Sequence, residues 1–243
     1  MGKDGRVIFR WIPAVWLAAL AGCGPVPVSD NAPASPEPRG TPAVRLPGDM
    51  SGVWATRDEN GTPFDIVLFP NGQAVTTFPK GPAGVRGERG FWRTEHNRAI
   101  ILFDDGWTDT LSVIDGRITH CGYAPGEDPD SGPRNSFPAE KFGGPAAVFV
   151  GVWRLNKEPD GSYLYVTLQS GGAAFSTING LTEGKWTLDG ESAKAVWPDG
   201  WVDRISRSAG EWQKVSSVGE SGDTPSDLER AVRVGETRFT IEP

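Results

Sequence analysis

A short pattern of two aspartates and a tryptophan occurs twice in the sequence. Asp105-Gly-Trp-Thr-Asp109 matches Asp199-Gly-Trp-Val-Asp203 at an offset of 94 residues. An Asp-Gly pair is a strong hairpin signal, so the first aspartate of each copy needs no role beyond the turn. Alternate residues of a strand share a face, so each later aspartate is predicted to lie beside the tryptophan on the apolar side. An unpaired carboxylate in that position would be costly.

Two interpretations of these later aspartates are open. In the first, each carboxylate accepts hydrogen bonds from backbone amides, a Trp N–H or an Arg, and so holds its hairpin. In the second, the aspartates lie in the mouth of a barrel and bind a polar or cationic ligand beside the tryptophans. The candidate ligand-binding residues are therefore Trp107, Asp109, Trp201 and Asp203.

The remaining residues do not form a recognisable catalytic or metal motif. His96 lies in a polar turn, and His120 adjoins Cys121; neighbouring strand residues face opposite sides, which argues against a joint metal site. No nucleophile elbow, phosphate loop, zinc motif or Ser/His/Asp set is present. We expect no catalytic residues, no metal, no cofactor and no enzymatic activity. A carboxylate-dependent hydrolase would need a second carboxylate or a histidine across a cleft from Asp109 or Asp203.

Cysteine chemistry is indicated at the amino-terminal end. A basic start is followed by the mainly apolar stretch 8–20, which is too short to span a bilayer as a helix. It ends in Leu20-Ala-Gly-Cys23, which resembles the lipobox of bacterial lipoproteins.

This resemblance implies that residues 1–22 are a signal peptide, cleaved between Gly22 and Cys23. It also implies that the Cys23 thiol and the new amino terminus are acylated with chains such as palmitate, which would hold the protein at the membrane. Gly24 would favour the outer membrane in a Gram-negative cell. The expected location is the cell membrane, through a covalent lipid.

The segment after the lipobox has the composition of a spacer. Residues 24–49 contain seven prolines and tend to polyproline II, so 23–49 is predicted to be a semi-rigid tether. Removal of the signal, with three basic groups and one acidic group, changes the formal charge from −7 to −9. That charge argues against nucleic acid and against docking on anionic lipid. Cys121 then has no disulfide partner in the chain and is expected to be buried.

The body of the chain contains an internal duplication. Gly52-Val-Trp54 matches Gly151-Val-Trp153 at an offset of 99, and Leu68 matches Leu168 at 100. Trp92 then matches Trp186 at 94, which places a six-residue insertion in the first copy. The predicted units are repeat A, 50–143, and repeat B, 144–243. Tryptophans at these matched positions are best explained by core packing.

Most segments between these landmarks alternate like strands. Each copy is predicted to be an antiparallel meander of about six to eight short strands, so the fold class is all-β with little helix. A Gly-x-Trp opening such a meander resembles lipocalin-like and avidin-like up-and-down barrels. Two small barrels, or one larger barrel or sandwich made by both copies, are the alternatives. Residues 227–232 suggest a helix, and 238–241 could close the sheet.

These features favour a lipid-anchored binding or accessory protein of the cell envelope, non-catalytic, with a small-molecule ligand or a protein partner. The alternative is a structural or assembly protein that contacts other envelope proteins through its sheet faces or the loops at 79–89 and 123–136.

Overall fold

A computed structural model describes residues 48–79, 86–158, 160–178, 180–219 and 228–236. The expected signal peptide, Cys23 and nearly all of the tether lie outside these residues, as does the strand expected at 238–241. Within the described part of the chain, no helix combines the length and apolar character needed to cross a membrane.

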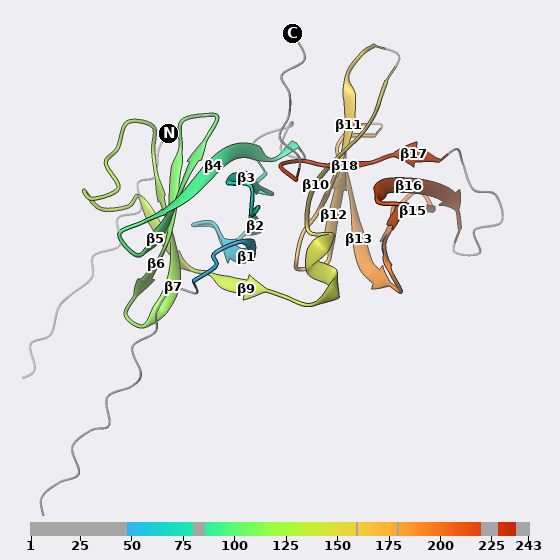
Figure 1. Cartoon of the computed structure of the whole chain (residues 1–243). Coiled ribbons are helices and arrows are strands. Elements are labelled where there is room, and N and C mark those ends of the chain that lie inside the picture. The colour runs from blue at the N-terminus through green and yellow to red at the C-terminus, as the bar shows by residue number, and fades with distance from the viewer. Residues whose placement is uncertain (1–47, 80–85, 159, 179, 220–227, 237–243) are drawn as a thin grey trace, which may run out of the picture. The chain divides into compact units, whose positions relative to one another are not determined.

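The described chain forms two separate antiparallel sheets (Figure 1). The first contains β1 (Gly52–Arg57), β2 (Pro63–Leu68), β3 (Gln73–Thr76), β4 (Glu88–Glu95), β5 (Arg98–Phe103), β6 (Thr108–Ile114), β7 (Arg117–Tyr123), β8 (Asn135–Pro138) and β9 (Glu140–Phe142). A 3-10 turn, η2 (Pro145–Val148), follows. The second contains β10 (Gly151–Lys157), β11 (Tyr163–Leu168), β12 (Ala173–Ser176), β13 (Thr182–Asp189), β14 (Ser192–Val196), β15 (Trp201–Ser208), β16 (Glu211–Val218), β17 (Glu229–Arg230) and β18 (Val232–Arg233). The all-β expectation is confirmed, with one sheet per copy.

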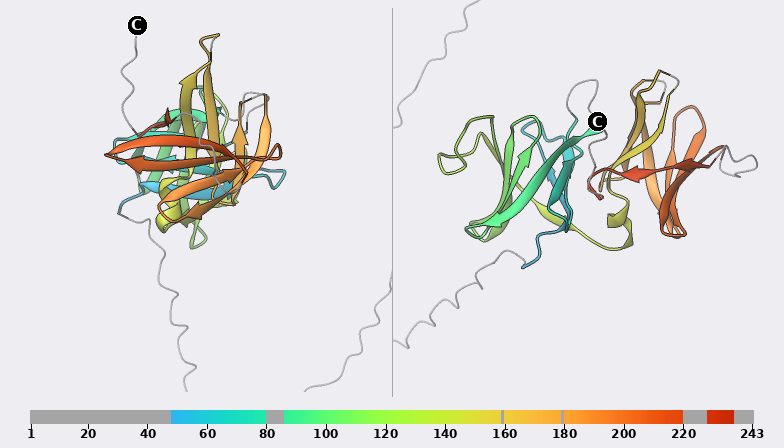
Figure 2. Two further views of the ribbon diagram at one scale, coloured as in Figure 1. Left: turned by 90° about the vertical axis from the view of Figure 1, so that its right-hand side faces the viewer. Right: turned by 45° about the horizontal axis from the view of Figure 1, so that its top comes forward.

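Each sheet curves back on itself (Figure 2) and is closed by one bent segment. In the first, β8 pairs with β7 and β9 pairs with β1, with the buried Ala139 at the bend between them. In the second, β17 pairs with β16 and β18 with β10 around the buried Ala231. The amide of Ala139 donates to the carbonyl of Ile118 and that of Ala231 to the carbonyl of Trp212, both at 3.0 Å. Both copies are therefore barrel-like.

A helix was expected at 227–232, and this prediction is wrong for residues 228–232, which the structure describes. The helical propensity of this segment is overridden by ladder hydrogen bonds, because Glu229 pairs with Lys214 and Val232 with Arg154.

The register of the two sheets repeats the duplication. Gly52 stands opposite Leu68, and Gly151 opposite Leu168. The change of offset from 99 to 100 arises in β10, where the register shifts by one residue between Arg154 and Lys157.

The first tryptophan of each copy makes the same buried contact. The indole Nε1–H of Trp54 donates to the carbonyl of Met50, and that of Trp153 to the carbonyl of Phe149, both at 2.9 Å. Both rings are almost fully buried, at 1% and 0% exposure.

Strand β2 is buried on both faces. Phe64, Ile66 and Leu68 lie in the core of the first sheet, as their alternation predicts. Val67, on the opposite face, belongs to a second cluster that also contains Val152 and Trp153. Apolar side chains of the second repeat therefore cover this second face of β2. Both sheets accordingly belong to one compact unit.

A buried carboxylate lies in the same region. Asp65, on β2, is 1% exposed and accepts hydrogen bonds from the backbone amide of Ser170 at 2.9 Å and from the Ser170 hydroxyl. Burial raises the pKa of Asp65 above its ordinary value, while the bonds from Ser170 act in the opposite direction.

Candidate functional site: the two barrel mouths

Asp109 lies inside the first barrel, facing a histidine. Asp109 is on β6 and His120 on β7, where His120 pairs with Leu111 and therefore points to the same side as Asp109. The Nε2 of His120 lies 2.9 Å from Oδ2 of Asp109, and both side chains are buried. The two atoms are close, but the contact lacks hydrogen-bond geometry, since neither ring nitrogen of His120 has a hydrogen-bond partner among the described residues.

The other ring nitrogen of His120 lacks a partner. His120 Nδ1 is buried and makes no hydrogen bond within the described part of the chain. The Phe64 ring packs edge-to-face against the imidazole, with ring centroids 5.6 Å apart. A buried polar atom without a partner is uncommon in a folded protein. This position is therefore one where a bound molecule could supply what the chain does not.

Asp109 is also incompletely bonded. Across the described residues, its side chain has one polar contact, the one from Oδ2 to His120. An ionised carboxylate offers about four acceptor positions. Its second oxygen is therefore available to a donor that the protein does not provide.

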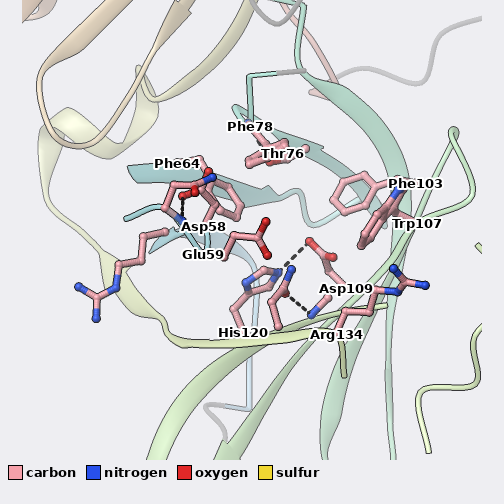
Figure 3. Close-up of a pocket in the computed structure, with 14 residues that line it drawn as sticks. Asp58, Glu59, Phe64, Thr76, Phe78, Phe103, Trp107, Asp109, His120 and Arg134 are labelled. Carbon is pink, nitrogen blue, oxygen red and sulfur yellow. Dashed lines mark hydrogen bonds and ion pairs between the residues drawn. The ribbon is translucent and has the colours of Figure 1, made fainter. Parts of the chain in front are cut away.

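A cavity of about 370 Å³ opens beside this pair. Its apolar walls are aromatic, and Figure 3 shows their rings arranged around the Asp109–His120 contact. These rings belong to Phe64, Phe78, Phe103 and Trp107. The volume falls within the usual range for small-molecule sites. The predicted pair Trp107 and Asp109 thus lies in one concave site.

Charged residues also line this mouth: Arg57, Asp58, Glu59 and Arg134. Asp58 is engaged in its own turn, where Oδ1 accepts the amides of Asn60 and Thr62 at 2.8 Å. Arg134 donates to Glu127 at 2.8 Å, and this bond holds the pKa of Glu127 below its ordinary value. Glu59 is exposed, and its side chain extends toward His120 and Asp109 (Figure 3).

Asp203 has far more partners in the mouth of the second barrel. The indole Nε1–H of Trp197 donates to Oδ2 at 2.8 Å, and the Ser216 hydroxyl donates to Oδ1 at 2.5 Å. The ammonium of Lys214 lies 3.4 Å from the same Oδ1. This aspartate matches the first interpretation, in which the carboxylate accepts a Trp N–H and holds its hairpin.

The second mouth also contains a cavity of about 370 Å³, lined by both Trp201 and Asp203. Trp201 is 40% exposed. Lys214 contacts Ser216 at 2.6 Å and Glu229 at 3.3 Å, so its charge is shared among three acceptors. The polar groups of this mouth are bonded mainly to one another.

Three substitutions between the copies account for this difference. At the offset of 94 that relates the two aspartates, Phe103 corresponds to Trp197, His120 to Lys214 and Gly122 to Ser216. Each residue of the second copy donates to or neutralises Asp203, whereas Phe103 and Gly122 have no side-chain donor. The two mouths share one backbone plan and differ in how completely their aspartates are satisfied.

Sequence reasoning missed His120 as a site residue, because no histidine occurs in the second copy at that position. The signal was the common offset of 94, which relates the basic residues His120 and Lys214 just as it relates the two aspartates. Cys121 faces away from His120 and is 2% exposed, with Sγ 3.6 Å from the Ser136 hydroxyl. Its predicted burial is confirmed. The described residues contain no group of three or more His, Cys, Asp or Glu arranged to hold a metal ion.

Comparison with known proteins finds no counterpart for this chain. No family model, no curated protein and no solved structure matches it.

Proposed function

We propose that the protein is a lipid-anchored binding protein of the cell envelope that holds a small molecule in the mouth of its first barrel. Cys23 carries the lipid, residues 23–49 form the tether, and the barrel body does not catalyse a reaction. The membrane is the outer one if the cell is Gram-negative. The lipobox-like segment Leu20–Cys23 supports the anchor.

One observation carries the binding proposal. Asp109 and His120 lie beside an aromatic-walled cavity of about 370 Å³ with acceptors that the chain leaves unused. The equivalent Asp203 shows that this fold can satisfy a carboxylate at the same place with its own side chains. The incomplete bonding in the first copy is therefore a property of that site and supports a ligand there.

A hydrolase is the second candidate, because the His120 side chain contacts Asp109. An aspartate-oriented histidine is the usual general base of hydrolytic enzymes. Here Nε2 faces the carboxylate, and Nδ1 is the nitrogen left to take a proton from a bound substrate. Hydrolysis of p-nitrophenyl acetate that is lost in His120→Ala, but kept in His96→Ala, would favour the enzyme instead.

The anchor is tested by metabolic labelling with palmitate. The wild-type chain should incorporate label and fractionate with membranes, whereas Cys23→Ser should do neither. Label in the Cys23→Ser variant would contradict the assignment.

The binding site is tested by native mass spectrometry of the protein purified from the cells that make it. We expect a small molecule to copurify with the wild type and to be lost in Trp107→Ala, with Trp201→Ala as the matched control. A wild-type protein that carries no bound molecule, and whose partner is instead recovered by crosslinking in membranes, would favour the assembly role.

A further inference from the structure

The walls and the rim of the first mouth restrict the chemistry of its occupant. We propose that this site, if it binds a small molecule as argued above, takes an aromatic compound that carries a protonated amino group, with the amine held at Asp109. The inference rests on the proposed binding function and adds the class of ligand.

The polar groups deep in the mouth call for a hydrogen-bond donor. The second oxygen of Asp109 accepts hydrogen bonds and cannot donate one while ionised. Neither ring nitrogen of His120 has a hydrogen bond among the described residues, and a neutral imidazole offers one of its two nitrogens as an acceptor. A ligand whose polar end is a carboxylate or phosphate would place acceptors against acceptors.

The charges around the opening favour a cationic donor over a neutral one. Glu59 extends toward the Asp109–His120 pair (Figure 3), and no salt bridge or hydrogen bond engages its carboxylate in the described structure. Arg134 is neutralised by Glu127 at 2.8 Å, which leaves Arg57 as the opposing cation among the lining residues. With a formal charge of −7 on the chain, the surrounding field also attracts cations.

The walls suit an aromatic body. Phe64, Phe78, Phe103 and Trp107 line one cavity, and Phe64 and Phe78 already meet edge-to-face at 5.1 Å. Aromatic rings gain from such offset and edge-to-face contacts beyond the burial of their area. An ammonium close to the Trp107 face would gain a further cation–π interaction.

The second mouth provides an internal contrast. Its carboxylate already has an intramolecular ammonium, since Lys214 lies 3.4 Å from Asp203 and 3.3 Å from Glu229. In the first copy the corresponding residue is His120, which is shorter and contacts Asp109 through one nitrogen. The proposed ligand amine would therefore supply to Asp109 what the Lys214 side chain supplies to Asp203.

Three probes that share one ring system test the class of ligand. The full-length protein is titrated calorimetrically with tryptamine, with the neutral alcohol tryptophol and with the anion indole-3-propionate. We expect tryptamine to bind most tightly, at least about tenfold more tightly than tryptophol, because hydrogen bonds between charged groups are the stronger ones. Indole-3-propionate should bind most weakly.

Two variants assign the preference to the carboxylates. Asp109→Asn should weaken tryptamine binding by about tenfold and leave tryptophol binding nearly unchanged. The variant would thus lose most of the preference for tryptamine over tryptophol. Glu59→Gln, at an exposed position where folding is not at risk, should weaken tryptamine by about twofold to threefold. Asp199→Asn removes the same charge from the rim of the second mouth and is expected to have no effect.

The outcomes separate the two proposals. If tryptophol or indole-3-propionate binds as tightly as tryptamine, and Trp107→Ala weakens that binding, the cationic class is overturned while the binding site stands. If Asp109→Asn folds like the wild type but keeps the full tryptamine preference, the placement of the amine is overturned. If none of the three probes binds at millimolar concentration, the aromatic-amine class is overturned, and the copurification experiment alone decides on a ligand.

Discussion

Lys214 in the second repeat occupies the position of His120 in the first. Each is the fourth residue of the strand that follows the aspartate-bearing strand, with His120 opposite Leu111 and Lys214 opposite Ile205. Both are buried, at 4% and 2% exposure, and both contact the aspartate of their own copy. Both repeats therefore contain a buried pair of an aspartate and a basic residue, and the basic residue differs between them.

The two aspartates should differ in their contribution to stability. Asp203→Asn removes a charge that compensates the buried Lys214, and we expect a loss of about 3 kcal/mol in the free energy of unfolding. Asp109→Asn should cost less than about 1 kcal/mol, because it changes one contact to His120. Urea unfolding of the purified variants measures both. Equal losses at the two sites would contradict the asymmetry, and Asp199→Asn at the surface serves as control.

Asp65 should make stability depend on pH. Its pKa in the folded state is raised above the ordinary value of 3.8 by burial, so the folded state favours the protonated form. The stability from Asp65 is thus complete below the unfolded-state pKa and is lost as pH rises through the folded-state pKa. Asp65→Asn, which cannot ionise, should become progressively more stable relative to wild type as pH rises from about 3 to 7.

Urea unfolding at a series of pH values measures that difference. Asp58→Asn, in an exposed turn of the same sheet, controls for general charge effects. A difference between wild type and Asp65→Asn that is constant with pH, or that changes in the opposite direction, would contradict a raised pKa.

The first tryptophans of the two copies should be energetically equivalent. Trp54→Phe and Trp153→Phe each delete a buried indole N–H and leave the carbonyl of Met50 or Phe149 without that donor. We expect each to lower the free energy of unfolding by about 2 kcal/mol. Trp201→Phe, at a position 40% exposed, should change it by less than about 0.5 kcal/mol. Thermal or urea unfolding measures these changes. A large difference in the loss of stability between Trp54→Phe and Trp153→Phe would contradict the equivalence.

Cys121 should be protected from reagents in the folded protein. In a full-length Cys23→Ser variant it is the remaining thiol, and it is 2% exposed. Reaction with Ellman's reagent should be slower than in denaturant by on the order of a hundredfold or more, since the thiol reacts only when the structure opens. Rapid stoichiometric reaction under native conditions would show that β7 opens readily.

Periodicity and repeat spacing were sufficient to predict the fold class. The observed strands confirm the antiparallel meander that was predicted for each copy, and β11, which lies between two turns, is one of them. The matched offsets predicted two copies, and the register of β1 with β2 and of β10 with β11 reproduces them. Local hydrogen bonding and side-chain alternation lie within one or two adjacent strands, so they can be read along the chain.

The closing segments could not be found in this way. Residues 135–142 and 229–233 are short, and their pairing partners β1 and β10 lie far away in sequence. Strands of two to four residues carry little alternation, and only the curvature of the whole sheet brings their partners within reach.

The repeated pattern of a tryptophan followed two residues later by an aspartate could be read from the sequence. Strand alternation also predicted that Asp109 and Asp203 lie on the inner side, where both are buried. The tertiary structure decided how far each aspartate is satisfied. That depends on Trp197, Lys214 and Ser216 contacting Asp203, whereas His120 contacts Asp109. Hydrogen bonds between strands need distances and directions, which a one-dimensional pattern does not contain.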